Sequence, residues 1–170
     1  SRYLTIKHFI QDRIHHLEQQ PALRFILIMT GYNLVADIVS VPFYLTSTSL
    51  GIERQLPSLD PLVLFISYNV TAPILETFLG QMVPILVARR FIRSSWIILL
   101  ISATLFAIPH STLDIFRLIP SFLGGILLAF TFLHWLKFSV GKAYWITCAV
   151  HFLHNVIVTS PLLFINGSNA

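Results

Sequence analysis

The chain is poor in charged residues and in cysteine. Only 11% of its 170 residues are Asp, Glu, Lys or Arg, whereas soluble domains carry about 25%. A soluble globular domain is therefore excluded, and the hydrophobic content of 55% indicates a polytopic membrane protein. The one cysteine, Cys148, lies in an apolar stretch. No disulfide can form within the chain, and we interpret Cys148 as a packing residue.

Acidic residues are also few, and the net charge of +4 lies mainly between the apolar runs. Residues 1–24 hold four Lys and Arg, the next four loops hold one, three, one and two, and the C-terminal tail holds none. This alternation follows the positive-inside rule for five spans, which puts the N-terminus in the cytoplasm and the C-terminus outside. We expect an integral protein of a bacterial plasma membrane or thylakoid-type membrane, in contact with lipid and without a nucleic-acid partner.

Long apolar runs predict an all-α bundle of about five transmembrane helices. They lie at 22–45, 61–88, 95–109, 119–136 and 143–164. The second run is long for a hydrocarbon core of about 30 Å, so it must tilt or kink, and Pro73 and Pro84 can supply kinks. Pro84 has no N–H to donate to the Gly80 carbonyl, which frees that carbonyl. We divide the chain into an amphipathic interfacial helix at 1–21 and a transmembrane bundle at 22–170.

Ionisable and amide side chains occur inside these apolar runs. An ionisable group in a membrane span costs about 2.5–3.5 kcal/mol on insertion scales, which favours a functional role. The residues of interest are Glu76, His110, His151 and Asn155. His151 and Asn155 are four residues apart, as are Phe106 and His110, so each pair shares one helix face. Gly80 lies one turn after Glu76 and is expected to leave space beside the carboxylate.

These four side chains suit hydrolysis of an acyl bond. A carboxylate beside an imidazole can deprotonate a water molecule, and an imidazole with an Asn amide can donate hydrogen bonds to an oxyanion. Other roles remain open from the residues alone. Glu76 can be a structural acid, His110 an interfacial residue, and His151 with Asn155 a hydrogen-bonded contact between helices. Two histidines and a glutamate can also bind Zn²⁺.

The segments APILETFLGQ, FAIPH and HFLHN resemble, in this order, the motifs of a known family. This is the CAAX-protease and bacteriocin-processing (CPBP or Abi) family of glutamic intramembrane proteases, and the resemblance covers about residues 70–160. It implies an intramembrane endopeptidase that needs no metal or cofactor and acts on a peptide or membrane-protein substrate. It also implies that Glu76 and His110 activate water, while His151 and Asn155 hold the oxyanion.

The first motif departs from the family pattern Glu-Glu-x-x-x-Arg. Thr77 stands where the second glutamate is expected and Gln81 where the arginine is expected. Losing one charge alone would leave an unpaired buried charge, which costs about 3–5 kcal/mol, whereas a Thr/Gln pair is neutral and can still hydrogen-bond. We therefore predict supporting roles for Thr77, Gln81 and Phe106. The departure keeps a second function open, that of a catalytically degenerate subunit or assembly factor of a larger membrane complex.

Three further polar residues are given structural roles. Asp37 lies one turn after Asn33, and we expect the two to form a hydrogen-bonded pair rather than a substrate or proton site. His154 flanks the face of His151 and is expected to pack beside the site or support it. His134 is near one end of its run and is expected at the membrane interface. Ion or proton transport through Asp37 and the histidines is the least favoured function, because no inverted repeat is visible.

Overall fold

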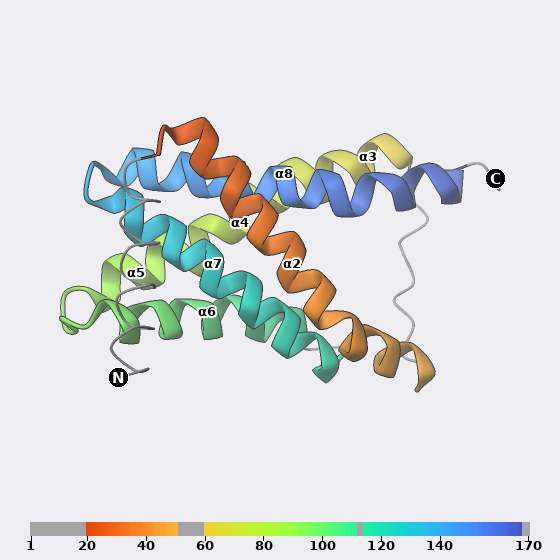
Figure 1. The fold of residues 1–170 in the computed structure, drawn as a ribbon, viewed down its shortest axis with the longest axis horizontal. Coiled ribbons are helices and arrows are strands. Elements are labelled where there is room, and N and C mark those ends of the chain that lie inside the picture. The colour runs from red at the N-terminus through yellow and green to blue at the C-terminus, as the bar shows by residue number, and fades with distance from the viewer. Residues whose placement is uncertain (1–19, 51–59, 112–113, 168–170) are drawn as a thin grey trace, which may run out of the picture.

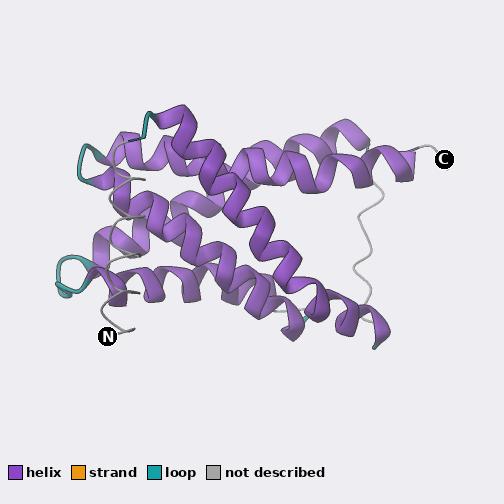
Figure 2. Cartoon of the chain, viewed as in Figure 1, coloured by secondary structure: helices purple, strands orange, loops and turns teal. Residues whose placement is uncertain are grey.

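The computed structural model describes residues 20–50, 60–111 and 114–167, and within them every regular element is helical (Figure 2). All but the last two residues of the amphipathic segment expected at 1–21 lie outside the described part. The elements are α2 (Ala22–Ser49), α3 (Pro61–Ile66), η1 (Ser67–Thr71), α4 (Ala72–Glu76), η2 (Thr77–Met82), α5 (Val83–Ala88), α6 (Ser95–Ser111), η3 (Ile115–Arg117), α7 (Leu118–Leu136) and α8 (Val140–Gly167). The prediction of an all-α bundle is confirmed, and the five predicted runs coincide with helices.

The outer surface of the bundle is apolar. Three helical stretches are long and apolar enough to cross a membrane, Ala22–Ser49, Pro61–Ala88 and Ile115–Leu136, and Ser95–His110 is a shorter apolar helix. Large apolar side chains point outward from several helices, including Leu23, Ile38, Leu79, Trp96 and Trp145. So much exposed apolar surface on one small domain suits contact with lipid chains rather than water.

The stretch from Pro61 to Ala88 is one continuous helical path with two π-helical segments, η1 and η2. Each π-helical segment is followed two residues later by a proline, Pro73 or Pro84. Proline removes a backbone donor and disturbs the preceding turn, which favours such widened turns. The Gly80 carbonyl, expected to be freed by Pro84, accepts a hydrogen bond from Ser102 Oγ at 2.8 Å.

The helices pack around one apolar core. α6 packs along α7 and α7 along α8, while α2 runs diagonally across both α7 and α8 (Figure 1). Phe25 of α2, Ile85 of α5, Phe132 of α7 and Val150 of α8 are fully buried in this core. The packing brings polar side chains of α2, α4, α6 and α8 toward the middle of the bundle.

The interface position expected for His134 is wrong. His134 is only 8% exposed. Its ring stacks on Phe25 with the ring centres 4.7 Å apart, and Trp135 meets it edge-on at 5.5 Å. The first turns of α2 cover this end of α7, a tertiary contact that position along a single span does not indicate.

Candidate active site

Glu76, His110 and His151 converge from three different helical elements. Glu76 Oε2 lies 3.4 Å from His110 Nε2 and 3.6 Å from His151 Nε2. Glu76 is the last residue of α4, His110 is at the end of α6, and His151 is in the middle of α8. The three candidate residues thus form one cluster, with both imidazoles turned toward the same carboxylate oxygen.

The hydrogen bond of His110 to its own helix determines which nitrogen faces Glu76. His110 Nδ1 is 2.8 Å from the Phe106 carbonyl oxygen. A carbonyl only accepts, so Nδ1 carries a proton and donates it. In the neutral imidazole, Nε2 is then an acceptor that faces a second acceptor, the Glu76 carboxylate. A water molecule has two O–H donors and can satisfy both groups at once.

Phe106 holds the His110 and His151 rings in place. Its ring stacks on His110 with centroids 4.7 Å apart and meets His151 edge-on at 5.8 Å. A Cβ atom on Gly80 would lie 2.9 Å from Phe106 Cδ2, and one on Gly125 would lie 3.2 Å from Phe106 Cδ1. The space expected beside the Glu76 carboxylate at Gly80 is therefore occupied by the Phe106 ring. Phe106 is wedged between two helices that approach closely because each has a glycine there.

His151 and Asn155 present donors one turn apart on α8. His151 is 6% exposed, and its Nδ1 is buried with no hydrogen-bond partner among the described residues. Asn155 Nδ2 donates one hydrogen bond to the Tyr68 carbonyl at 2.9 Å. An amide nitrogen carries two protons, so a second N–H of Asn155 remains for a ligand.

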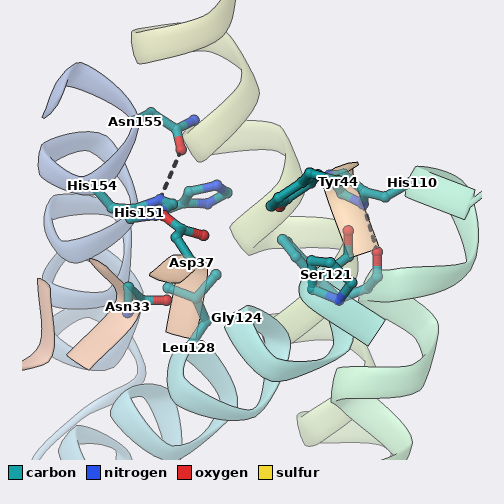
Figure 3. Close-up of a pocket in the computed structure, with 12 residues that line it drawn as sticks. Asn33, Asp37, Tyr44, His110, Ser121, Gly124, Leu128, His151, His154 and Asn155 are labelled. Carbon is teal, nitrogen blue, oxygen red and sulfur yellow. Dashed lines mark hydrogen bonds and ion pairs between the residues drawn. The ribbon is translucent and has the colours of Figure 1, made fainter. Parts of the chain in front are cut away.

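A cavity of about 150 Å³ lies beside the cluster (Figure 3). Its polar lining comes largely from Asn33, Asp37, His110, His151, His154 and Asn155. Glu76 is not part of this lining and approaches the two histidines from the α4 side. Since one water occupies about 30 Å³ of liquid volume, the cavity has room for a few waters or one peptide group. It can therefore hold the small polar part of a larger ligand.

Thr77 and Gln81 are both fully buried, but they are not hydrogen-bonded to each other. Gln81 Oε1 lies 2.6 Å from Ser102 Oγ of α6, and neither Gln81 Nε2 nor Thr77 Oγ1 has a partner among the described residues. The possibility that the two side chains bond to one another is thus not realised. Ser102 has a single hydroxyl proton, and turning the Gln81 amide over would let Gln81 donate to Ser102 while Ser102 donates to Gly80.

Asp37 pairs with His154, not with Asn33. Asp37 Oδ2 is 2.6 Å from His154 Nε2, whereas Asn33 Nδ2 donates to the Met29 carbonyl at 2.9 Å. The expected Asn33–Asp37 pair is therefore wrong, while a supporting position for His154 agrees with the contacts seen. An acid inside one apolar run and a histidine beside a motif in another were the signals available. Their pairing depends on how α2 crosses α8, which the sequence pattern did not indicate.

A charged contact closes the end of the bundle near Tyr44. Asp114 accepts a hydrogen bond from Ser47 Oγ at 2.6 Å and pairs with Arg117 Nε at 3.1 Å. The Arg117 guanidinium lies over the Tyr44 ring, 5.9 Å from its centre. The hydrogen bond from Ser47 is the main cause that lowers the pKa of Asp114, aided by the Phe116 N–H and by Arg117. This contact joins the last turns of α2 to η3.

Comparison with known proteins assigns the chain to a family. A family model described as Rce1-like, type II CAAX prenyl endopeptidase Rce1-like, matches residues 58–157. No curated protein and no solved structure matches the chain. The matched region is more than half of the chain and contains Glu76, His110, His151 and Asn155. Together with the apolar helices it identifies an integral membrane protein and confirms the resemblance seen in the motifs. The chain belongs to the Rce1-like family of type II CAAX prenyl endopeptidases.

Proposed function

We propose that the protein hydrolyses a peptide bond inside or at the surface of the membrane, with Glu76, His110, His151 and Asn155 as its catalytic residues. The observation that carries this proposal is the approach of one Glu76 oxygen to two imidazoles, at 3.4 and 3.6 Å. In an apolar bundle, a carboxylate and an imidazole that face each other form a site for a water molecule. The membership of the chain in an endopeptidase family supports the same reaction class.

The proposed reaction begins with a water held by Glu76 and the Nε2 atom of His110. Its oxygen attacks the carbonyl carbon of the scissile bond, and its proton passes to the Glu76–His110 pair, the general-base step. The carbonyl oxygen becomes an oxyanion and accepts hydrogen bonds from the Nδ1–H of His151 and the remaining N–H of Asn155. Such donors contribute about 10²–10³-fold to the rate. The C–N bond then breaks, and the leaving amine takes the proton from the Glu76–His110 pair.

The family description suggests the substrate to try first. We propose a prenylated CAAX-type peptide, because the matched family is that of CAAX prenyl endopeptidases. Its lipid chain would lie along the apolar surface of the helices, and the peptide group to be cleaved would enter the cavity of about 150 Å³. The proposed mechanism uses no metal ion. Among the described residues, no group of three His, Cys, Asp or Glu side chains has the arrangement of a metal site.

A farnesylated, internally quenched Cys-aliphatic-aliphatic-X peptide tests this proposal with protein purified in lipid nanodiscs. Cleavage should occur after the farnesylated cysteine and should fall at least 100-fold in Glu76→Gln and in His110→Ala. Thr104→Ala is a matched control, because Thr104 is an exposed residue of α6 that bonds only to the Leu100 carbonyl. Cleavage that survives both Glu76→Gln and His110→Ala would end the proposal, and chelator treatment should leave the rate unchanged.

The replacement of the usual Glu and Arg by Thr77 and Gln81 favours a second function. A degenerate family member could serve as a subunit or assembly factor, because Gln81 Nε2 and Thr77 Oγ1 are buried without partners. This function predicts a protein that copurifies with the chain at constant stoichiometry and a normal phenotype in a Glu76→Gln strain. A catalytic function predicts that the Glu76→Gln strain behaves like a deletion.

A further inference from the structure

The cavity wall formed by α2 and α8 contains a chain of hydrogen bonds that ends on Asn155. We propose that Asp37 and His154 are positioning residues that hold the Asn155 amide in the orientation needed to bind an oxyanion. This inference rests on the proposed function, because it assigns a support to one of its catalytic residues. It concerns two side chains to which neither the motifs nor the family match gives a role.

The orientation of the Asn155 amide follows from its two partners. Asn155 Nδ2 is 2.9 Å from the Tyr68 carbonyl oxygen, which can only accept, so the nitrogen end must face Tyr68. The oxygen end, Oδ1, then faces His154 Nδ1 at 3.3 Å. Turning the amide over would place two acceptors against each other at Tyr68. The Tyr68 carbonyl thus excludes the flipped amide.

The proton positions on His154 follow in turn. Because Asn155 Oδ1 is an acceptor, His154 Nδ1 must carry a proton and donate it. His154 Nε2 is 2.6 Å from Asp37 Oδ2, a distance that requires one proton between the two atoms. The Asp37–His154 pair therefore holds two protons along the chain, one directed at Asn155 and one shared with the carboxyl group (Figure 3).

Asp37 acts on Asn155 by selecting the state of the imidazole. A neutral histidine without Asp37 can place its single proton on Nε2, which leaves a lone pair on Nδ1 facing Asn155 Oδ1. Two facing lone pairs repel, and the amide would turn away and weaken its bond to Tyr68. Outer hydrogen-bond partners of this kind orient an imidazole and commonly change activity by about 10–100-fold when removed.

Asp37 belongs to a helix that the family match does not include. The match begins at residue 58, and α2 ends at Ser49. Asn33, one turn before Asp37, lines the same cavity but spends its donor on the Met29 carbonyl. Asp37 is therefore the side chain of α2 that reaches His154, and α2 contributes a part of the site from outside the matched region.

Two substitutions separate hydrogen bonding from charge at this position. Asp37→Asn removes the carboxylate, but its amide N–H can donate to His154 Nε2 and keep the proton on Nδ1. Asp37→Leu has a similar size and cannot hydrogen-bond. Ser40→Ala is the control, because Ser40 is a buried polar residue of α2 that bonds to the Ala36 carbonyl and does not line the cavity.

The direct measurement is the protonation pattern of His154 in ¹⁵N-histidine-labelled protein in nanodiscs, assigned with a His154→Gln variant. Nδ1 should be protonated in the wild type and in Asp37→Asn, with an unprotonated Nε2 in the latter. Asp37→Leu should show the Nε2–H form. An unchanged His154 pattern in Asp37→Leu would overturn the proposal. If Asp37→Leu does not fold, His154→Phe replaces it in the kinetic comparison, where it should match the loss expected of Asp37→Leu.

Kinetics on the farnesylated peptide give the second readout. Asp37→Leu should lower kcat by about 10–100-fold with little change in KM, whereas Asp37→Asn and Ser40→Ala should stay within about threefold of the wild type. Equal losses in Asp37→Asn and Asp37→Leu would also overturn the proposal, because charge rather than orientation would then matter. A wild type that cleaves no peptide would count against the proposed function alone, since the His154 spectra still decide the orientation.

Discussion

His110 donates from Nδ1 to the carbonyl oxygen of Phe106, at 2.8 Å, one turn earlier on the same helix. The four-residue spacing of the Phe and His therefore does two things. It stacks the two rings, and it commits one imidazole nitrogen to the backbone so that the other faces Glu76. The geometry of a single helix thus determines the tautomer of a residue whose partner lies on another helix.

Gly80→Ala should disturb the site through Phe106. The added methyl group would lie 2.9 Å from Phe106 Cδ2, and overpacking of this kind costs typically about 1–3 kcal/mol. We expect lower thermal stability in detergent and a cleavage rate at least tenfold lower, because His110 follows the Phe106 ring. Gly31→Ala is the matched control, since a Cβ there has no atom within 4 Å. Equal behaviour of the two variants would show that the close contact at Gly80 is unimportant.

Restoring the family's charges should be harmful one at a time and milder together. Thr77 and Gln81 are fully buried, so Thr77→Glu or Gln81→Arg alone would bury an unpaired charge, at about 3–5 kcal/mol. In the double variant the two charges are one turn apart and can pair. The measurement is the folded yield after extraction, compared by size-exclusion chromatography. Losses that simply add in the double variant would mean that the two positions do not interact.

Asp114→Asn should reduce stability at neutral pH but not in acid. The hydrogen bond from Ser47 and the contact with Arg117 lower the pKa of Asp114 below its ordinary value of 3.8. A lowered pKa means that the ionised carboxylate stabilises the folded state above pH 3.8, and that this contribution is lost as the pH falls through the folded-state pKa. Thermal unfolding of both proteins between pH 7 and pH 3 should show two midpoints that converge at the acid end. A constant difference would contradict the assignment.

The membrane orientation remains a prediction from the distribution of Lys and Arg. Single cysteines at Ser94 and Ile115, in a Cys148→Ala background, should be labelled from opposite sides of sealed vesicles. Both positions are exposed. An impermeant maleimide added to right-side-out vesicles should modify Ile115→Cys and spare Ser94→Cys until the vesicles are opened. Equal labelling of the two would refute the orientation.

The sequence predicted what depends on spacing within one helix. The helix positions, the pairing of Phe106 with His110 and the freed carbonyl of Gly80 all follow from short-range rules and agree with the structure. The assembly of Glu76 with His110 and His151 needed the family resemblance as well, because no spacing rule places three separate helices together.

The contacts that were missed are those between helices distant in sequence. Asp37 and His154 are 117 residues apart, and the partner of Gln81 is Ser102 on the next helix. Which polar residue faces which depends on the crossing of α2 over α8 and of α6 against η2. Buried polar residues find whatever partner these crossings offer, so the nearest candidate along the chain, such as Asn33 for Asp37, is a poor guide.

The two π-helical segments have a consequence for how the acid is aimed. Glu76 ends the short α-helical stretch Ala72–Glu76, with a widened turn on each side. Each widened turn carries an additional residue, and one residue corresponds to about 100° of rotation around an α-helix. Deleting a single residue from Thr77–Met82 would therefore leave the helix intact but turn the carboxylate away from both imidazoles. In this protein the direction of the catalytic acid is a matter of angular phase along one helix, and a change of one residue in length would act on it more strongly than most substitutions.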